Sequence, residues 1–217
     1  MAYDSLEREQ KWRSVCMSEL AKKTEFPSLV APCGAFEPVL DRLTLEIHHG
    51  RIYKEAFSQI ARDKKYHQLL CEEKEMPFSS SSCRLEAGRV YDCHQFYFNG
   101  ITPPSLLGLR LPQGKILAQI QKDFISFESF FSAVQELTQR VNEVGFLWCV
   151  YTKRGMGLRF LPDHQTPPSY ERPLFCIDLW EHAYFLRYHE RKDAYIYGFF
   201  RIIDWTVVQN RLEKIKK

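Results

Sequence analysis

Four side chains of this sequence could hold a metal ion together. His48 and His94 each lie on a predicted helix face that is otherwise apolar, and His182 follows Asp178 by four residues, where a short apolar strand ends. Burying an unpaired aspartate is costly, and a metal ion is one of the few partners that offsets this cost. Imidazole and carboxylate together suit Mn, Fe or Zn, whereas calcium prefers oxygen ligands. The residues alone leave two interpretations open: a metal site, or histidines that simply belong to the core.

Two helices in the first half of the chain would carry His48 and His94. Apolar residues recur at three- and four-residue steps over 38–70, which predicts one long amphipathic helix with Pro38 as its first residue. Gly50 inside this helix marks either close packing or a break. A linker over 73–83 then leads to a second helix over 85–98.

The hydrophobic pattern changes in the second half. Ser126 is a suitable N-cap for a helix with an apolar stripe. FLWCVYTK and LRFLP, joined by a turn at 154–157, predict a β-hairpin, and LFCID predicts a short buried strand. WEHAYFLRYHER would form a helix directly after that strand, and the last residues would also be helical. The predicted fold class is α+β: an N-terminal helical hairpin domain, then a mixed domain with a small antiparallel sheet flanked by helices.

The prolines of ITPPS mark the predicted domain boundary. We expect a polar N-terminal extension over 1–30, a helical hairpin domain over 31–103, and an α/β domain with a three-stranded antiparallel sheet over 104–217. The chain has 217 residues, of which 45% are hydrophobic and 14% aromatic, so a large core is possible and disorder is excluded. A formal net charge of +3 is too small to argue for nucleic-acid binding by itself.

The cellular setting is constrained by the cysteines and by the lack of long apolar runs. The seven cysteines are scattered without a C-x-x-C pair, which favours a reducing, intracellular setting over a disulfide framework. The sequence does not decide between mitochondrion and cytoplasm. The first residues do not resemble a secretory signal. No apolar run approaches the roughly 18–20 residues that cross a bilayer, so we expect no membrane segment.

Three motifs resemble those of one enzyme family. LFCIDLWEHAYFLRYHE resembles the C-terminal signature D-x-W-E-H-A-Y of the iron/manganese superoxide dismutases. HQFYFN at 94–99 is similar to that family's H-x-F-Y-W-N on its second long helix. LEIHHGRIY at 45–53 lies in the place of the family's L-x-x-H-H on the first long helix, and GAFEP precedes it. The motifs occur in the family's order, and the resemblance covers roughly residues 27–210.

The resemblance implies a catalytic metal site. The implied metal ligands are His48, His94, Asp178 and His182. They would hold one Fe or Mn ion per chain, with a solvent molecule as fifth ligand, in an antioxidant enzyme that disproportionates superoxide to oxygen and hydrogen peroxide. His164 would be the outer group that hydrogen-bonds the bound solvent, with Gln165 in that place if the register shifts by one residue.

The resemblance also implies a homodimer and an aromatic pocket. Glu181 would reach across the interface to His182 of the partner subunit. The residues that would line the metal pocket are Trp148, Trp180 and Tyr97.

Four positions depart from the family's pattern. Ile52 and Ala56 stand where the family has a histidine and a gateway tyrosine, Phe185 replaces a tyrosine, and Val150 replaces a tryptophan. Loss of the residues that hydrogen-bond the ligands of a metal site commonly lowers metal affinity or activity by about 10–100-fold. A second hypothesis is therefore a dismutase-fold structural or interaction subunit in a protein or ribonucleoprotein assembly, for example a mitochondrial ribosome.

The other histidines are expected to play no part in the site. His49 and His189 would be surface or interface residues, and His67 would lie in a charged helix end. Replacing His182 by alanine should abolish metal binding, whereas replacing His67 should not.

Overall fold

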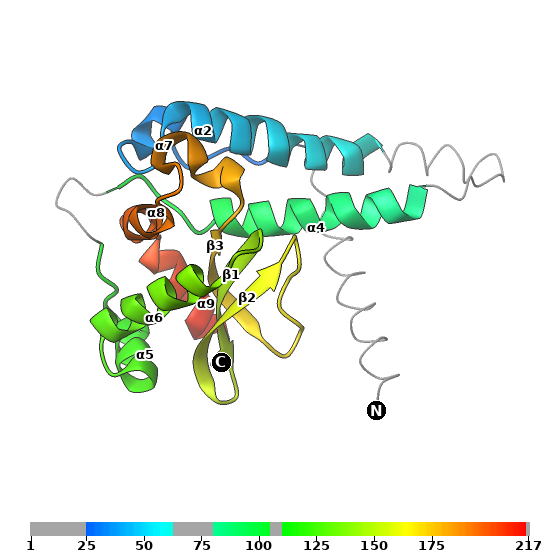
Figure 1. Cartoon of the computed structure of the whole chain (residues 1–217). Helices are drawn as coiled ribbons and strands as arrows, with labels where there is room; N and C mark the ends of the chain where they lie inside the picture. Colours follow the sequence, from blue (N-terminus) through cyan, green and yellow to red (C-terminus); the bar gives the residue numbers. More distant parts are fainter. Residues whose placement is uncertain (1–24, 63–79, 105–109, 216–217) are drawn as a thin grey trace.

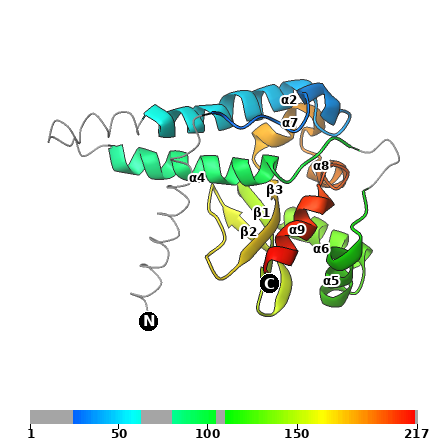
Figure 2. The same ribbon diagram turned by 180° about the vertical axis from the view of Figure 1, so that it is seen from behind.

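Two long helices run side by side and form one layer of the molecule (Figures 1 and 2). The computed structural model describes residues 25–62, 80–104 and 110–215. The first long helix comprises α2 (Arg42–Ile47), a π-helical turn η2 (His48–Tyr53) and further helical residues to position 62; the second is α4 (Ser80–Phe98). A short 3-10 helix, η1 (Cys33–Phe36), precedes them. Predictions for residues 1–24, His67 and the first helix beyond position 62 lie outside the described residues.

A three-stranded antiparallel sheet packs beneath α4. The sheet contains β1 (Gly145–Thr152), β2 (Gly155–Pro162) and β3 (Arg172–Asp178), in the order β2-β1-β3. In the register of β1 with β3, Phe146 faces Asp178, which is the last residue of its strand. Contacts between α4 and β3 bring the end of this strand close to the helix layer.

Helices of the second half surround the sheet. α9 packs on β3, α5 packs on β2, and α6 packs on α8. Their bounds are α5 (Gly114–Phe124), α6 (Phe127–Arg140), α8 (Lys192–Phe199) and α9 (Trp205–Ile215). The Ser126 hydroxyl accepts a hydrogen bond from the Ser129 amide at 3.1 Å, so the predicted N-cap of α6 is present. The helices and the small sheet confirm the predicted α+β class.

The structure corrects the predicted bounds of the first two helices. α2 begins at Arg42 rather than at Pro38, because the Asp41 side chain accepts a hydrogen bond from the Thr44 amide at 2.9 Å and caps the helix there. Gly50 lies within the π-helical turn, and a Cβ atom there would meet nothing within 4 Å, so close packing does not explain this glycine. α4 begins at Ser80, within the predicted linker.

The predicted helix after β3 is also wrong. The chain forms only a 3-10 turn, η3 (Glu181–Ala183), and one helical turn, α7 (Phe185–Tyr188). Tyr184 between them has φ −146° and ψ −22°, and His189 ends α7 at φ +52°. Neither residue has helical dihedral angles, so a continuous helix cannot pass through them.

The core is continuous across the predicted domain boundary. Buried side chains such as Tyr97 from the helix layer and Phe146, Phe175 and Phe199 from the second half belong to one cluster. The Thr102 amide donates to the Ile202 carbonyl at 2.8 Å, which ties the connecting segment to the C-terminal part. The division at position 103 stays a prediction. Within the described residues, no helix is both long enough and apolar enough to cross a membrane.

Gly145 at the start of β1 allows the strands to meet near Asp178. A Cβ atom on Gly145, at φ +157°, would collide with the Leu161 carbonyl oxygen and lie 2.9 Å from the Pro162 Cα. We expect Gly145→Ala to lower the free energy of unfolding by about 3 kcal/mol or more, measured by urea denaturation. The matched control is Gly157→Ala on β2, where a Cβ meets nothing within 4 Å. Equal losses in the two variants would contradict this packing argument.

Candidate metal centre

The four predicted donor residues come together where the helix layer meets the end of the sheet. His48 opens η2, His94 lies on α4, Asp178 ends β3 and His182 lies in η3. One ligand atom from each of them lies within 4.8 Å of the others. Residues from both halves of the chain therefore form one cluster.

The three imidazoles surround a single carboxylate oxygen. Asp178 Oδ2 lies 3.1 Å from His48 Nε2, 3.4 Å from His182 Nε2 and 3.9 Å from His94 Nε2. The His48 ring centroid lies 4.9 Å from that of His94 and 4.7 Å from that of His182. The Nε2 atoms of all three rings thus face the same small volume.

These donor atoms are buried and lack hydrogen-bond partners. His48, His94 and Asp178 are fully buried, and the His182 side chain is 19% exposed. The three Nε2 atoms and Asp178 Oδ2 have no hydrogen-bond partner within the described part of the chain. Buried polar atoms without partners are rare and call for an explanation. One Fe or Mn ion fits this set of three nitrogens and one carboxylate oxygen.

Burial and neighbouring charges keep His48, His94 and Asp178 in the protonation states that metal ligands need. Burial lowers the pKa of His48 to about 4, although Asp178 acts in the opposite direction. Burial, reinforced by the neighbouring His48, lowers the pKa of His94 to about 3. Burial would raise the pKa of Asp178, but the imidazoles of His182 and His48 outweigh it and hold that pKa well below its usual range. Near neutral pH, His48 and His94 are neutral and Asp178 is charged, as metal binding requires.

Hydrogen bonds to neighbouring backbone groups fix two of the donors. His94 Nδ1 lies 2.7 Å from the Val90 carbonyl oxygen one turn earlier on α4. Because a carbonyl can only accept, Nδ1 carries the hydrogen and Nε2 keeps its lone pair toward the cluster. Asp178 Oδ1 accepts a hydrogen bond from the Trp180 amide at 2.9 Å, which leaves Oδ2 directed at the histidines.

The π-helical turn η2 places two consecutive histidines in the interior. His48 enters the cluster, and His49 is only 8% exposed, which overturns its expected place at the surface. The reason is the segment before η1, which folds over His49. The Phe26 ring lies 4.8 Å from the His49 ring, and His49 Nε2 lies 3.1 Å from the Pro27 carbonyl oxygen. His189 is exposed, as predicted.

Comparison with known proteins identifies the family of the chain. Residues 112–211 match the model of the iron/manganese superoxide dismutase C-terminal domain. The chain is 30% identical over 197 residues to a Mn/Fe superoxide dismutase of Rickettsia bellii, covering 87% of this chain and 92% of that protein. It is 26% identical to the mitochondrial Mn superoxide dismutase of Onchocerca volvulus (94% and 93% covered), and 28% identical to an Fe superoxide dismutase of Bacteroides fragilis (87% and 98% covered).

The chain belongs to the iron/manganese superoxide dismutase family. Both the order of the motifs and the near-complete coverage of the Rickettsia bellii relative support this assignment. The relatives include Mn, Mn/Fe and Fe enzymes, so they leave the choice between the two metals open.

His164 borders the donor cluster of this dismutase-family protein. Its ring stacks on Trp180 at 4.9 Å between centroids and on His94 at 5.5 Å. The His164 side chain is 12% exposed, and its Nε2 atom is buried without a hydrogen-bond partner among the described residues. Gln165, the alternative for this position, is exposed.

The predicted pocket aromatics lie at different depths. The Tyr97 ring lies 5.2 Å from the His48 ring, and the Trp180 ring lies 5.8 Å from the His182 ring. Trp148 lies behind Phe146, 6.1 Å away, and it is Phe146 that contacts both His94 at 5.9 Å and His164 at 5.7 Å. Sequence reasoning missed Phe146. Its signal was the two-residue period of a strand, which places Phe146 and Trp148 on one face.

The four residues that depart from the family's pattern have apolar side chains and differ in how deeply they are buried. Ala56 and Val150 are buried, Ile52 is half-buried, and Phe185 is 45% exposed. None of these side chains can hydrogen-bond. Tyr53, the residue after Ile52, is buried. Its ring stacks on the His94 ring with 6.2 Å between the centroids, so Tyr53 packs against one of the predicted metal ligands.

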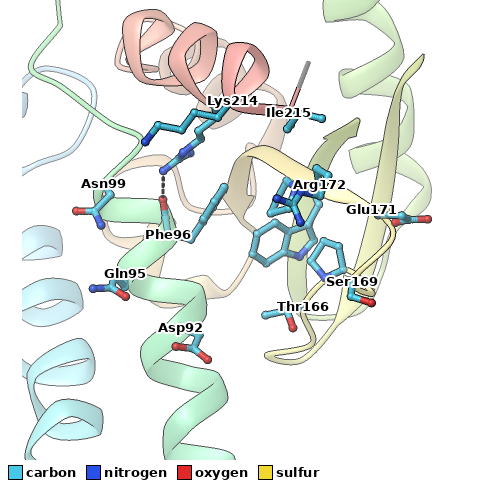
Figure 3. A pocket seen from close by; sticks show the side chains of 14 residues that line it. Asp92, Gln95, Phe96, Asn99, Thr166, Ser169, Glu171, Arg172, Lys214 and Ile215 are labelled. Atoms are coloured by element: carbon cyan, nitrogen blue, oxygen red, sulfur yellow. Dashed lines mark hydrogen bonds between the residues drawn. The ribbon is translucent and has the colours of Figure 1, made fainter. Parts of the chain in front are cut away.

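A cavity of about 390 Å³ is lined by Trp148 together with residues outside the donor cluster (Figure 3). It lies between α4, the segment before β3 and the end of α9, and its charged lining carries both signs, with Asp92 on α4 and Lys214 on α9. Arg211 closes one wall. Its guanidinium lies 3.8 Å above the Phe96 ring and donates to the Leu174 carbonyl at 2.7 Å. Arg211 thereby ties α9 to both α4 and β3, the elements that carry His94 and Asp178.

Proposed function

We propose that this protein catalyses the disproportionation of superoxide with one Fe or Mn ion per chain. The observation that carries the proposal is the set of three imidazole Nε2 atoms and one carboxylate oxygen, all buried, unpartnered and within 4.8 Å of one another. The proposed metal ligands are His48, His94, Asp178 and His182. The family relatives support this chemistry.

The reaction consumes two superoxide ions and two protons and yields one oxygen and one hydrogen peroxide. When bound, the ion would supply the one-electron chemistry, taking an electron from one superoxide and giving one to the next. The histidines and Asp178 would hold the ion, with His48 and His94 neutral near neutral pH and Asp178 charged. His164 stacks on His94, has a buried Nε2 atom without a hydrogen-bond partner among the described residues, and is the proposed outer group that orients solvent.

The apolar surroundings should make the enzyme slow. Ile52, Ala56 and Phe185 cannot order water or relay protons toward the site. We expect turnover to be about 10–100-fold below that of a dismutase with the full hydrogen-bonded surroundings. The relatives named above are dismutases, and no observation on the described residues favours the alternative of a ribosomal or other structural subunit.

We also propose a homodimer. Glu181 is exposed directly beside His182, and the apolar side chains of Phe185 and Leu186 on α7 are 45% and 50% exposed. A second copy packed on this face would cover them and bring Glu181 toward His182 of the partner subunit. A reducing, intracellular setting is supported by the free cysteines Cys93, Cys149 and Cys176.

Metal analysis followed by an activity assay tests the proposed function. After expression with both Fe and Mn supplied, mass spectrometry should find close to one Fe or Mn per chain, and the loaded protein should accelerate superoxide decay in proportion to its metal content. If the protein binds stoichiometric metal but does not accelerate superoxide decay, the metal would serve only to stabilise the fold. A folded protein that takes up neither metal, even on refolding, would contradict the proposal.

A further inference from the structure

We propose that Asp163 is a positioning residue that fixes which nitrogen of His164 carries the hydrogen. This inference rests on the proposed dismutase function for its role, but the hydrogen bond itself can be tested independently. His164 Nδ1 lies 2.9 Å from Asp163 Oδ1. A carboxylate offers only acceptors, so Nδ1 is the donor and carries the hydrogen. In a neutral imidazole, Nε2 then has a free lone pair.

The Nε2 atom is the buried side of a ring that borders the donor cluster. The Nε2 atom is buried without a partner among the described residues, whereas the Asp163 side chain is 63% exposed. The His164 ring stacks on Trp180 and on His94 and also contacts Phe146. The exposed carboxylate therefore controls, through the ring, a nitrogen that solvent does not reach. With a free lone pair, Nε2 would accept a hydrogen bond from a donor in the pocket. With a hydrogen on Nε2, the ring would instead donate a hydrogen bond and stabilise an anion.

The backbone holds Asp163 in this orientation. Asp163 has φ +54°, in the left-handed region that aspartate tolerates better than most side chains. Its amide donates to the Val144 carbonyl at 3.0 Å, and the Gln165 amide donates to the Pro162 carbonyl at 3.3 Å, which closes the turn. One residue further, Gly145 accepts from the Leu179 amide at 2.9 Å. The turn that carries His164 is thus anchored beside the strand end that carries Asp178.

Nitrogen NMR of the histidine rings tests the inference. We would record spectra of the metal-free and Zn-loaded full chain, labelled with ¹⁵N-histidine, at about pH 8.5, two units above the ordinary histidine pKa. A His164→Gln variant assigns the His164 signals. We expect the wild-type ring to carry its hydrogen on Nδ1. In Asp163→Gly, where glycine keeps the left-handed turn and the acceptor is lost, a large fraction should move to Nε2.

Two further measurements complete the test. The control Gln165→Gly changes the same turn without touching Nδ1 and should leave the His164 signals as in the wild type. With equal metal content, Asp163→Gly should dismutate superoxide about 10-fold more slowly than the wild type. A wild-type ring with its hydrogen on Nε2, or unchanged signals in Asp163→Gly, would overturn the inference. The expected ring state in a protein without dismutase activity would contradict the proposed function but leave the Asp163 contact established.

Discussion

Replacing His182 by alanine is expected to reduce bound Fe or Mn from about one ion per chain to nearly none. The variant removes one of the four converging donors, so the loss of affinity should exceed the roughly 100-fold that changes around the ligands can cause. His182 is the best of the four for this test because it is partly exposed, at 19%, whereas His48 and His94 are fully buried and their truncation would leave cavities in the core. The measurement is metal content by mass spectrometry after identical expression.

A second histidine variant controls for nonspecific loss. His189→Ala changes an exposed residue that ends α7, whose ring lies 5.8 Å from that of Phe185. It should retain the full metal content. Circular dichroism would show whether both variants are folded. Normal metal content in a folded His182→Ala protein would rule out the proposed set of ligands.

Acidification is expected to destabilise the metal-free protein well above the pH at which most carboxylates titrate. Burial lowers the pKa of His48 to about 4 and of His94 to about 3, whereas an unfolded histidine has a pKa near 6.5. Below about pH 6.5 the unfolded chain binds protons that the folded chain cannot, so stability falls as pH falls. From about pH 7 to about pH 5, each of these histidines should lower the free energy of unfolding by about 2 kcal/mol.

Asp92 acts in the opposite direction. Burial raises its pKa to about 6, so between about pH 6 and pH 4 the folded chain binds a proton that the unfolded chain does not. Asp92 therefore adds roughly 1 kcal/mol to the free energy of unfolding by about pH 5. Together with the two histidines, the net loss in the free energy of unfolding is about 3 kcal/mol. That loss is a large part of the stability of an ordinary domain, about 5–15 kcal/mol.

Urea denaturation at several pH values checks this expectation. The free energy of unfolding of the metal-free protein should decline steadily between about pH 7 and about pH 5. In Asp92→Asn, which has no carboxyl group to titrate at this position, the decline should be steeper by about 1 kcal/mol. A free energy of unfolding that is constant or rises over this range would show that the two imidazoles are not held neutral by burial.

The sequence predicted those parts of the site that short motifs encode. Asp178 and His182 occur in one specific signature, and the family order pointed to His48 and His94, so the four side chains that the structure brings together were named before any geometry was known. The α+β class followed from the change in hydrophobic period near residue 145. The short apolar run LFCID also located the strand that ends at Asp178.

Features that depend on contacts between distant segments could not be predicted in this way. His49 is buried because Phe26 and Pro27 fold over it, which no local pattern indicates. The broken helix after β3 depends on the dihedral angles of Tyr184 and His189, two residues that ordinarily fit helices. The hydrogen bond between Asp163 and His164 required the turn geometry, although the residues are adjacent in the sequence.

The origin of the four donors in both halves of the chain has a consequence for biosynthesis. His48 and His94 leave the ribosome well before Asp178 and His182, which lie far later in the sequence. A nascent chain therefore offers at most two of the four donor side chains until translation has passed Asp178. The complete set of four donors can therefore assemble only after both halves of the chain have been made.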